Sequence, residues 1–199
     1  PWPLADGAAV DIFQPLPQVT DQRGEWVKFT LAYAAVVIGA QPRMGKTFLL
    51  RQLLLAAGLD PRTKVYSLDG KGTGDLAPTR LFAHFYSVGD EPEEVEGRVL
   101  PALRELRAEM RRRAKFLREL PHEEAPESKV TSELATKYPH LAPVVVGIDE
   151  TQAYFGYGDK SNKHHKAVRD ELTAIVTDLA KRGPALGFIT LLATQNVCE

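Results

Sequence analysis

The chain has 199 residues, of which 44% are hydrophobic and 26% charged, a balance typical of one soluble globular domain with a sizeable core. Its 25 basic and 26 acidic side chains leave a net charge of -1, which excludes a protein that attracts nucleic acid through its overall field. A single cysteine, Cys198, excludes an internal disulfide, and the longest apolar stretch, 31–40, is shorter than the roughly 20 residues of a membrane span.

The first thirty residues are rich in proline and glycine. Turn residues at this density indicate an extended lead-in, which we expect to end in a strand over 25–31. We therefore divide the chain into a lead-in over 1–32 and a core over 33–199. Because the chain opens on proline without a methionine and stops just after an apolar strand, we expect it to be a fragment of a longer protein, with the core truncated at its C-terminus.

Strands and helices alternate along the first half of the core. The elements expected here are strands over 34–38, 64–68 and 84–88 and a helix over 48–57. A long helical stretch follows, in which apolar residues recur at helical spacing from Leu103 to Leu117. Pro101 either kinks this stretch or begins its second half.

The second half of the core opens on residues 121–142, which are polar and lack periodicity, and we expect a mobile loop there, with or without a short helix. An apolar strand over 144–148, a helix over 166–181 and a last strand over 188–193 follow. The inward-facing residues of that helix are Val168, Leu172, Ile175, Val176 and Leu179. The alternation predicts an α/β fold with a mostly parallel sheet, helices on both faces, and a ligand site at the carboxyl ends of the strands.

The turn between the first core strand and the first helix fits the phosphate-binding pattern G-x-x-x-x-G-K-[ST] at all but its first position. The predicted nucleotide-binding residues are Ala40, Gln41, Pro42, Arg43, Met44, Gly45, Lys46, Thr47 and Phe48. Such a loop wraps its backbone N–H groups around phosphates at a helix N-terminus. Ala40 replaces the first glycine, and Pro42 removes one N–H group. The alternative is an ordinary strand-to-helix turn that contains Gly-Lys-Thr.

The side chains that carry the chemistry come from both ends of the core. Lys46 supplies a point charge to the β- and γ-phosphates of ATP, and the hydroxyl of Thr47 coordinates Mg²⁺. Asp149 and Glu150 end an apolar strand, where we predict that Asp149 binds Mg²⁺ and Glu150 acts as general base; the alternative is a surface pair that caps the strand. Gln195, after the last strand, either senses the γ-phosphate as a third catalytic residue or only caps its strand.

Three further stretches extend the match to a known family. They are residues 68–76 (LDGKGTGDL), 109–113 (EMRRR) and 179–195 (LAKRGPALGFITLLATQ). Together with the phosphate loop and the acidic strand end, they make the chain resemble the FtsK/SpoIIIE DNA translocases, and within them the transfer proteins of actinobacterial conjugative and integrating elements. The sequence departs from the family at two positions. Ala40 replaces the usual glycine of the loop, and Pro184 stands where many members of the wider family have arginine.

The resemblance implies a P-loop NTPase with a RecA-like core, which assembles into a homo-oligomeric, hexameric ring around double-stranded DNA and couples ATP hydrolysis to translocation. It implies a cytoplasmic domain of a bacterial protein, attached to the membrane, if at all, through regions outside this chain. In the mobile-element branch the cargo is plasmid DNA.

Basic residues form two clusters. The helical stretch over 104–118 carries many arginines interleaved with glutamates, and we favour a solvated face there over DNA contact. The loop after the acidic strand end carries Lys160, Lys163 and Lys166, which are candidate DNA contacts because translocating ATPases often grip phosphates from such loops. The alternative is a flexible surface loop.

Three functions compete. The leading one is an ATPase that translocates double-stranded DNA, in conjugative transfer or chromosome segregation. The second is a related type VII secretion ATPase that exports protein; the Asp149-Glu150 pair and the Asp-Gly-Lys-Gly segment favour the DNA branch. The third is a module that binds nucleotide to hold an assembly together without hydrolysis, which Ala40 and Pro42 motivate.

Overall fold

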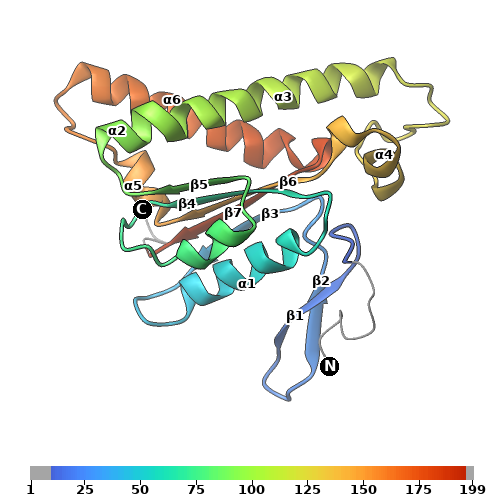
Figure 1. Ribbon diagram of the computed structural model, residues 1–199, viewed down its shortest axis with the longest axis horizontal. Coiled ribbons are helices and arrows are strands. Elements are labelled where there is room, and N and C mark those ends of the chain that lie inside the picture. Colours follow the sequence, from blue (N-terminus) through green and yellow to red (C-terminus); the bar gives the residue numbers. More distant parts are fainter. Residues whose placement is uncertain (1–9, 196–199) are drawn as a thin grey trace.

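The computed structural model describes residues 10–195, so the start of the predicted lead-in and Cys198 lie outside the described residues. Five strands form one sheet in the order β3-β7-β6-β4-β5, and every pairing in it is parallel (Figure 1). They are β3 (Ala35–Gly39), β4 (Lys64–Asp69), β5 (Phe85–Val88), β6 (Val144–Asp149) and β7 (Phe188–Thr194). All five predicted core strands are confirmed.

Helices cover both faces of the sheet, as predicted. The helices are α1 (Lys46–Gly58), α2 (Pro92–Glu94), α3 (Leu100–Glu119), α4 (Ser132–Lys137), α5 (Thr151–Phe155) and α6 (Lys163–Arg182). Helix α1 lies on one face, while α3 and α6 lie side by side on the other (Figure 1). The five residues predicted to face inward on α6 are all buried. Among the described residues, no helix is long and apolar enough to cross a membrane.

The central strand, β6, carries no polar side chain from Val144 to Ile148, because helices cover the sheet from both sides. Every residue of β6 is buried, and its apolar side chains enter one core beneath α3 and α6 and another beneath α1. Gly147 sets the distance to α1, since a Cβ atom there would lie 2.7 Å from Cδ2 of Leu54. The absence of a side chain therefore brings the helix that follows the phosphate loop close to the strand that ends in the two acids.

The long helix agrees with one of the two alternatives for Pro101 and departs from the sequence expectation at Arg113. Helical backbone runs from α2 through a single π-helical turn over Val95–Val99 into α3, and Pro101 falls in the first turn of α3, directly after the π turn. Pro101 therefore begins the second half of the helical stretch, which is one of the two alternatives that the sequence leaves open. Arg113 is 2% exposed and is not part of the solvated face predicted for this stretch.

Arg113 reaches across the base of the sheet. Its guanidinium donates hydrogen bonds to the carbonyl oxygens of Leu186, at 3.1 Å, and Ala142, at 2.9 Å, and it lies 4.6 Å from the ring centroid of Phe188. Its Nε donates to Glu109 at 3.1 Å. One cation thus satisfies carbonyl groups from the connections that enter β6 and β7.

The lead-in forms a two-stranded antiparallel hairpin, β1 (Leu16–Thr20) and β2 (Trp26–Phe29), which projects from the α1 side of the molecule (Figure 1). The strand expected over 25–31 is β2. Strand β1 escapes the sequence analysis because its flanking and internal prolines look like turn signals. Arg62 ties the lead-in to the core through 2.7 Å and 2.8 Å ion pairs with Asp11 and Asp60.

The polar segment 121–142 contains α4, the short helix that the sequence leaves open. Thr131 caps this helix by accepting a hydrogen bond from the N–H group of Leu134 at 3.2 Å. Val130, Leu134 and Leu141 are buried against the core. The mobility of the segment stays a prediction, although these side chains anchor it at several points.

Candidate nucleotide-binding site

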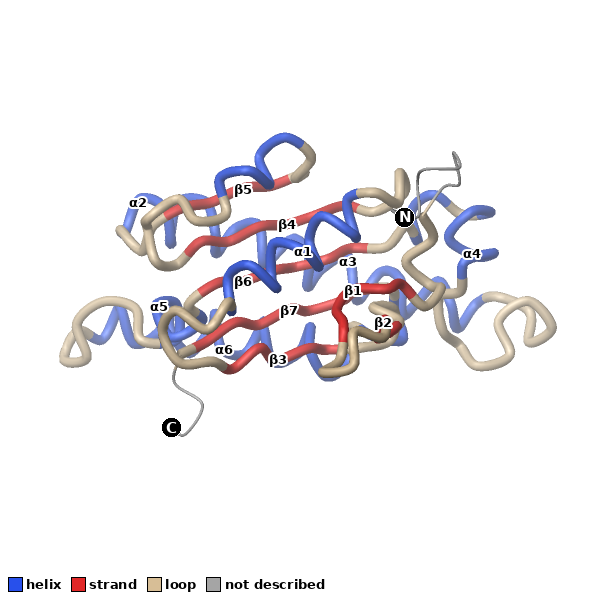
Figure 2. The backbone as a smooth tube through the Cα atoms, turned by 90° about the horizontal axis from the view of Figure 1, so that it is seen from below, coloured by secondary structure: helices blue, strands red, loops and turns tan. Residues whose placement is uncertain are grey.

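The parallel sheet brings the predicted site residues to one edge. Gly39 at the end of β3 pairs with Thr194 at the end of β7, and Asp69 at the end of β4 pairs with Asp149 at the end of β6. The phosphate loop, the acidic pair and Gln195 therefore follow neighbouring strand ends, as Figure 2 shows from below the sheet.

The loop over residues 40–45 turns through two left-handed residues, Arg43 with φ of 68° and Gly45 with φ of 84°. Nothing lies within 4 Å of a Cβ atom built on Gly45, so glycine is required there by the backbone conformation. Arg43 carries backbone strain of the kind that collects at binding sites. Ala40 is not among the described residues with positive φ, which explains why the methyl group at the pattern's first position is tolerated.

Helix α1 begins immediately after this loop. No side chain caps its N-terminus and no acidic residue stands in its first turn, so its N–H groups and helix dipole face the loop without competition. The cavity here has a volume of about 400 Å³ and is lined by residues 41–43 and 45–48 together with Lys71 and Gln195. Ala40 and Met44 are the predicted loop residues outside that lining.

Lys46 is buried and binds both acids at the end of β6. Its ammonium donates a short hydrogen bond to Asp149 and a 2.8 Å hydrogen bond to Oε1 of Glu150. Thr47 donates from its hydroxyl to Oδ2 of Asp149 at 2.8 Å. Asp149 and Glu150 are 0% and 6% exposed, so they are not a surface pair that caps the strand. Two carboxylates at such depth require a cation beside them.

Glu150 is held in a strained conformation, with φ of 53°. Its carboxylate accepts hydrogen bonds from Lys46, from the side-chain amide of Gln195 at 2.6 Å and, at short distance, from that of Gln152. Burial alone would raise the pKa of Glu150, but the hydrogen bonds from Lys46, Gln152 and Gln195 outweigh it and hold the pKa below its usual range. The carboxylate is therefore ionised at neutral pH.

Two residues of the site escape the sequence analysis as individual side chains. Gln152 bridges two strand ends, since it donates to Glu150 and accepts a 2.9 Å hydrogen bond from the hydroxyl of Thr194. Lys71 lines the cavity and pairs with Asp75 at 3.1 Å. The sequence does hold a signal that could have identified Lys71, namely its place in the glycine-rich segment after β4. For Gln152, a lone glutamine close after Glu150, the sequence holds no such signal.

The oxygen atoms of Thr47 and Asp149 fit Mg²⁺ in kind. Hydroxyl and carboxylate oxygens are the hard ligands that this ion prefers, and it is usually bound by one or two protein groups together with substrate phosphates. Among the described residues no group of three or more histidine, cysteine, aspartate and glutamate side chains could hold a metal alone. A shared protein and phosphate site is the arrangement that these two residues suit.

The basic loop lies apart from this cavity. Lys160, Lys163 and Lys166 are exposed on the connection between α5 and α6 and on the first turn of α6. The connection projects at the same end of the molecule as the carboxyl ends of the strands (Figures 1 and 2). Asn162 caps α6 and His164 contacts Glu96 at 2.6 Å, so the loop has an ordered base.

No family model and no curated protein matches the sequence, whereas solved structures match the fold. The pCW3 conjugation coupling protein TcpA, solved as a monomer with ATPγS, is similar with a TM-score of 0.71 and 18% identity over 92% of this chain and 50% of its own. ATPases 2 and 3 of EssC from Geobacillus thermodenitrificans give 0.68 and 18% over 96% of this chain and 35% of that one.

The cytoplasmic domain of the type VII secretion ATPase EccC from Thermomonospora curvata gives a TM-score of 0.65 and 16% identity over 98% of this chain and 22% of that one. This chain thus spans half or less of the length of each of these structures. At such identities the likeness establishes the fold, which is the predicted α/β fold with a parallel sheet and helices on both faces.

Proposed function

We propose that the chain is the ATP-hydrolysing core of a motor that translocates double-stranded DNA. The observation that carries this proposal is the buried cluster in which Lys46 and Thr47, from the start of α1, meet Asp149 and Glu150 from β6. A lysine, a hydroxyl and two acids beside a free helix N-terminus are the groups that phosphoryl transfer uses.

In this proposal the chain's residues divide the work of hydrolysis. The N–H groups of the loop and of α1 bind the phosphates, and Thr47 and Asp149 hold Mg²⁺, which neutralises phosphate charge when bound. Lys46 turns from the two acids to the β- and γ-phosphates. Its departure removes a hydrogen bond that lowers the pKa of Glu150, so burial raises that pKa toward the range of a general base, and Glu150 accepts the proton of the attacking water. Gln195 contacts the γ-phosphate.

DNA is the favoured cargo because three exposed lysines, Lys160, Lys163 and Lys166, lie at the same end of the molecule as the nucleotide cavity. TcpA, a conjugation coupling protein, shares the fold. A ring of six copies, attached to a membrane through other parts of a longer bacterial protein, would place this loop of each copy toward the duplex. Protein export is the second candidate, since the type VII secretion ATPase EccC shares the fold with a TM-score of 0.65.

The decisive experiment measures ATP hydrolysis by the full-length protein with and without double-stranded DNA. We expect DNA to stimulate the wild-type rate at low salt, and the stimulation to fall as salt rises because phosphate contacts release counterions. Replacing Lys160 with alanine should make the slope of log affinity against log salt concentration less steep, by about 1.

Glu150→Gln serves as the control for hydrolysis, with an expected loss of at least roughly 100-fold in rate while nucleotide binding persists. Equal rates in the wild type and this variant would refute hydrolysis at this site and leave the assembly module. Hydrolysis that DNA does not stimulate at low salt would favour protein export.

Gln152 is a positioning residue in this scheme. We expect Gln152→Ala to lower kcat by about 10-fold with little change in KM, because a hydrogen bond to a charged group is lost. Gln152→Asn, which keeps an amide, should recover part of kcat. Because the amide also lowers the pKa of Glu150, the acid limb of the pH profile should move to higher pH in the alanine variant. An unchanged profile would show that Gln152 only fills space.

A further inference from the structure

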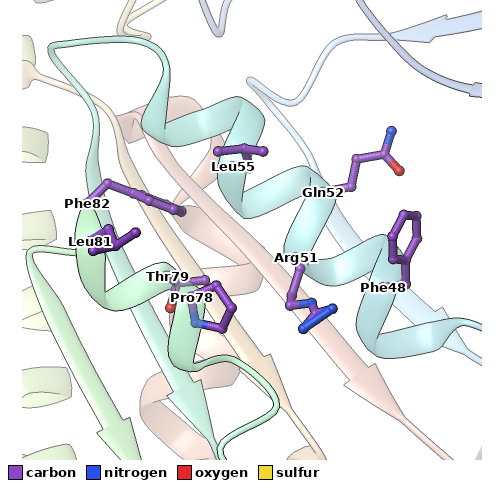
Figure 3. Close-up of a pocket in the computed structure, with 8 residues that line it drawn as sticks. All are labelled: Phe48, Arg51, Gln52, Leu55, Pro78, Thr79, Leu81 and Phe82. Carbon is purple, nitrogen blue, oxygen red and sulfur yellow. The ribbon is translucent and has the colours of Figure 1, made fainter.

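We infer that an apolar groove beside the phosphate loop binds the purine base of the nucleotide. The inference rests on the proposed function, because it concerns the nucleotide whose phosphates bind at the start of α1. The groove has a volume of about 550 Å³, within the range of small-molecule sites. One side is the outer face of α1, and the other is the 3-10 turn η1 (Ala77–Leu81) with Phe82 (Figure 3).

Several of the residues that line the groove are apolar and exposed. Phe48, Arg51 and Leu55 follow one another along α1 at three- and four-residue spacing, and they form a stripe along one wall of the groove. Phe48 is 65% exposed and Leu55 42% exposed, and Leu81, on the facing turn, is 92% exposed. Large apolar side chains left open beside a helix start mark a ligand or partner surface.

The groove adjoins the phosphate cavity. Phe48 lines both, and it follows directly on Thr47 at the first turn of α1. With a rise of about 1.5 Å per residue, the stripe from Phe48 to Leu55 extends about 10 Å along the helix, which is the scale of a ribose with a purine. A nucleotide held by its phosphates at Gly45 to Thr47 would therefore find its base at this stripe.

One loop shapes both sites. Buried Asp69 accepts hydrogen bonds from the N–H groups of Lys71, at 3.2 Å, and Leu76, at 3.3 Å, and so fixes the glycine-rich segment between β4 and η1. The beginning of that segment places Lys71 at the phosphate cavity, and its end leads into η1, which places Pro78 in the groove. One segment therefore contributes to both subsites.

The chemistry of the groove suits an aromatic base. Figure 3 shows Arg51 between Phe48 and Pro78, and its guanidinium is held by a 3.1 Å hydrogen bond to the carbonyl oxygen of Asp75. An aromatic ring and a fixed planar cation are the surfaces on which bases stack, and Leu55 and Phe82 keep water from the edge of the base.

The test compares ATP with inorganic tripolyphosphate, which has the phosphates and no base. Binding of each is measured by calorimetry for this chain and for two variants, Phe48→Ala and Leu81→Ser, which change exposed side chains and should leave thermal unfolding unchanged. We expect each variant to weaken ATP binding by roughly 10- to 100-fold and to leave tripolyphosphate binding within about twofold. Trp26→Ala, which removes an exposed aromatic ring from the β1-β2 hairpin, is the matched control and should change neither.

Each of the other possible results refutes a specific part of the proposal. Wild-type protein that binds tripolyphosphate as tightly as ATP, or variants that bind ATP normally, would refute the base site and leave the phosphate site intact. Variants that lose both ligands equally would show that Phe48 and Leu81 act on the phosphates alone. Wild-type protein that binds neither ligand would refute nucleotide binding, and with it the proposed function.

Discussion

Replacing Lys46 with methionine is expected to destabilise the ligand-free protein by about 3–5 kcal/mol at pH 7, because the variant leaves two buried carboxylates without their cation. Lys46 joins Asp149 and Glu150, which are almost inaccessible to solvent. Urea denaturation at several pH values measures the change. A protein of this size should also lose about 2–4 °C of Tm for each kcal/mol.

The pH dependence of this destabilisation identifies the buried carboxylate as its cause. In the wild type the pKa of Glu150 is lowered, so its contribution to stability is present above the pKa of the unfolded state and lost as pH falls through the folded value. In the variant, burial without Lys46 raises that pKa, so the variant gains stability as pH falls. The difference in unfolding free energy between the wild type and Lys46→Met should therefore become smaller from pH 7 toward pH 4.

Two further variants control for other causes. Lys71→Met removes an exposed lysine of the same cavity and should change stability by less than about 0.5 kcal/mol. Adding Glu150→Gln to Lys46→Met removes one uncompensated charge and should restore part of the lost stability. A Lys46→Met protein as stable as the wild type would mean that the buried ion pair does not form.

Arg113→Met is expected to cost about 3 kcal/mol in unfolding free energy, because it deprives the buried carbonyl groups of Ala142 and Leu186 of their donor. Methionine has a similar length, so lost packing against Phe188 contributes less than the lost hydrogen bonds. The effect should appear in thermal unfolding, with little pH dependence between pH 6 and 9, since arginine stays charged throughout.

Arg111→Met is the matched control. It makes the same change two residues earlier on α3, where the side chain is exposed, and should stay within about 0.5 kcal/mol of the wild type. Equal effects in both variants would show that the arginines act through the charge of the helix and not through the carbonyl groups that Arg113 binds.

The pattern of apolar residues and the positions of turn residues predict the core of the fold, because its strands are buried on both sides. The apolar run at 144–148 lies in β6, and the helix expected over 166–181 is α6, which begins at Lys163 and ends at Arg182. The same logic predicts that Lys46, Asp149 and Gln195 meet, since parallel strands bring their carboxyl ends to one edge.

The features that the sequence does not predict depend on contacts between segments that are far apart in the chain. Arg113 looks like its exposed neighbours, and only the approach of the chain at residues 141–142 and 186 buries it. Gln152 gains its role from Thr194, which lies 42 positions away. The groove between α1 and η1 needs both walls in place, and neither wall has a pattern of its own.

The pairing of β3 with β7 has a consequence for the order in which the molecule is made. The strand that leads into the phosphate loop hydrogen-bonds, among the described residues, to the last strand of the sheet, with Ala35 opposite Thr190. Closing so long a stretch of chain is a slow step in folding. A ribosome must therefore release nearly all of the described chain before the phosphate loop gains its support, and a shorter nascent chain should hold no nucleotide.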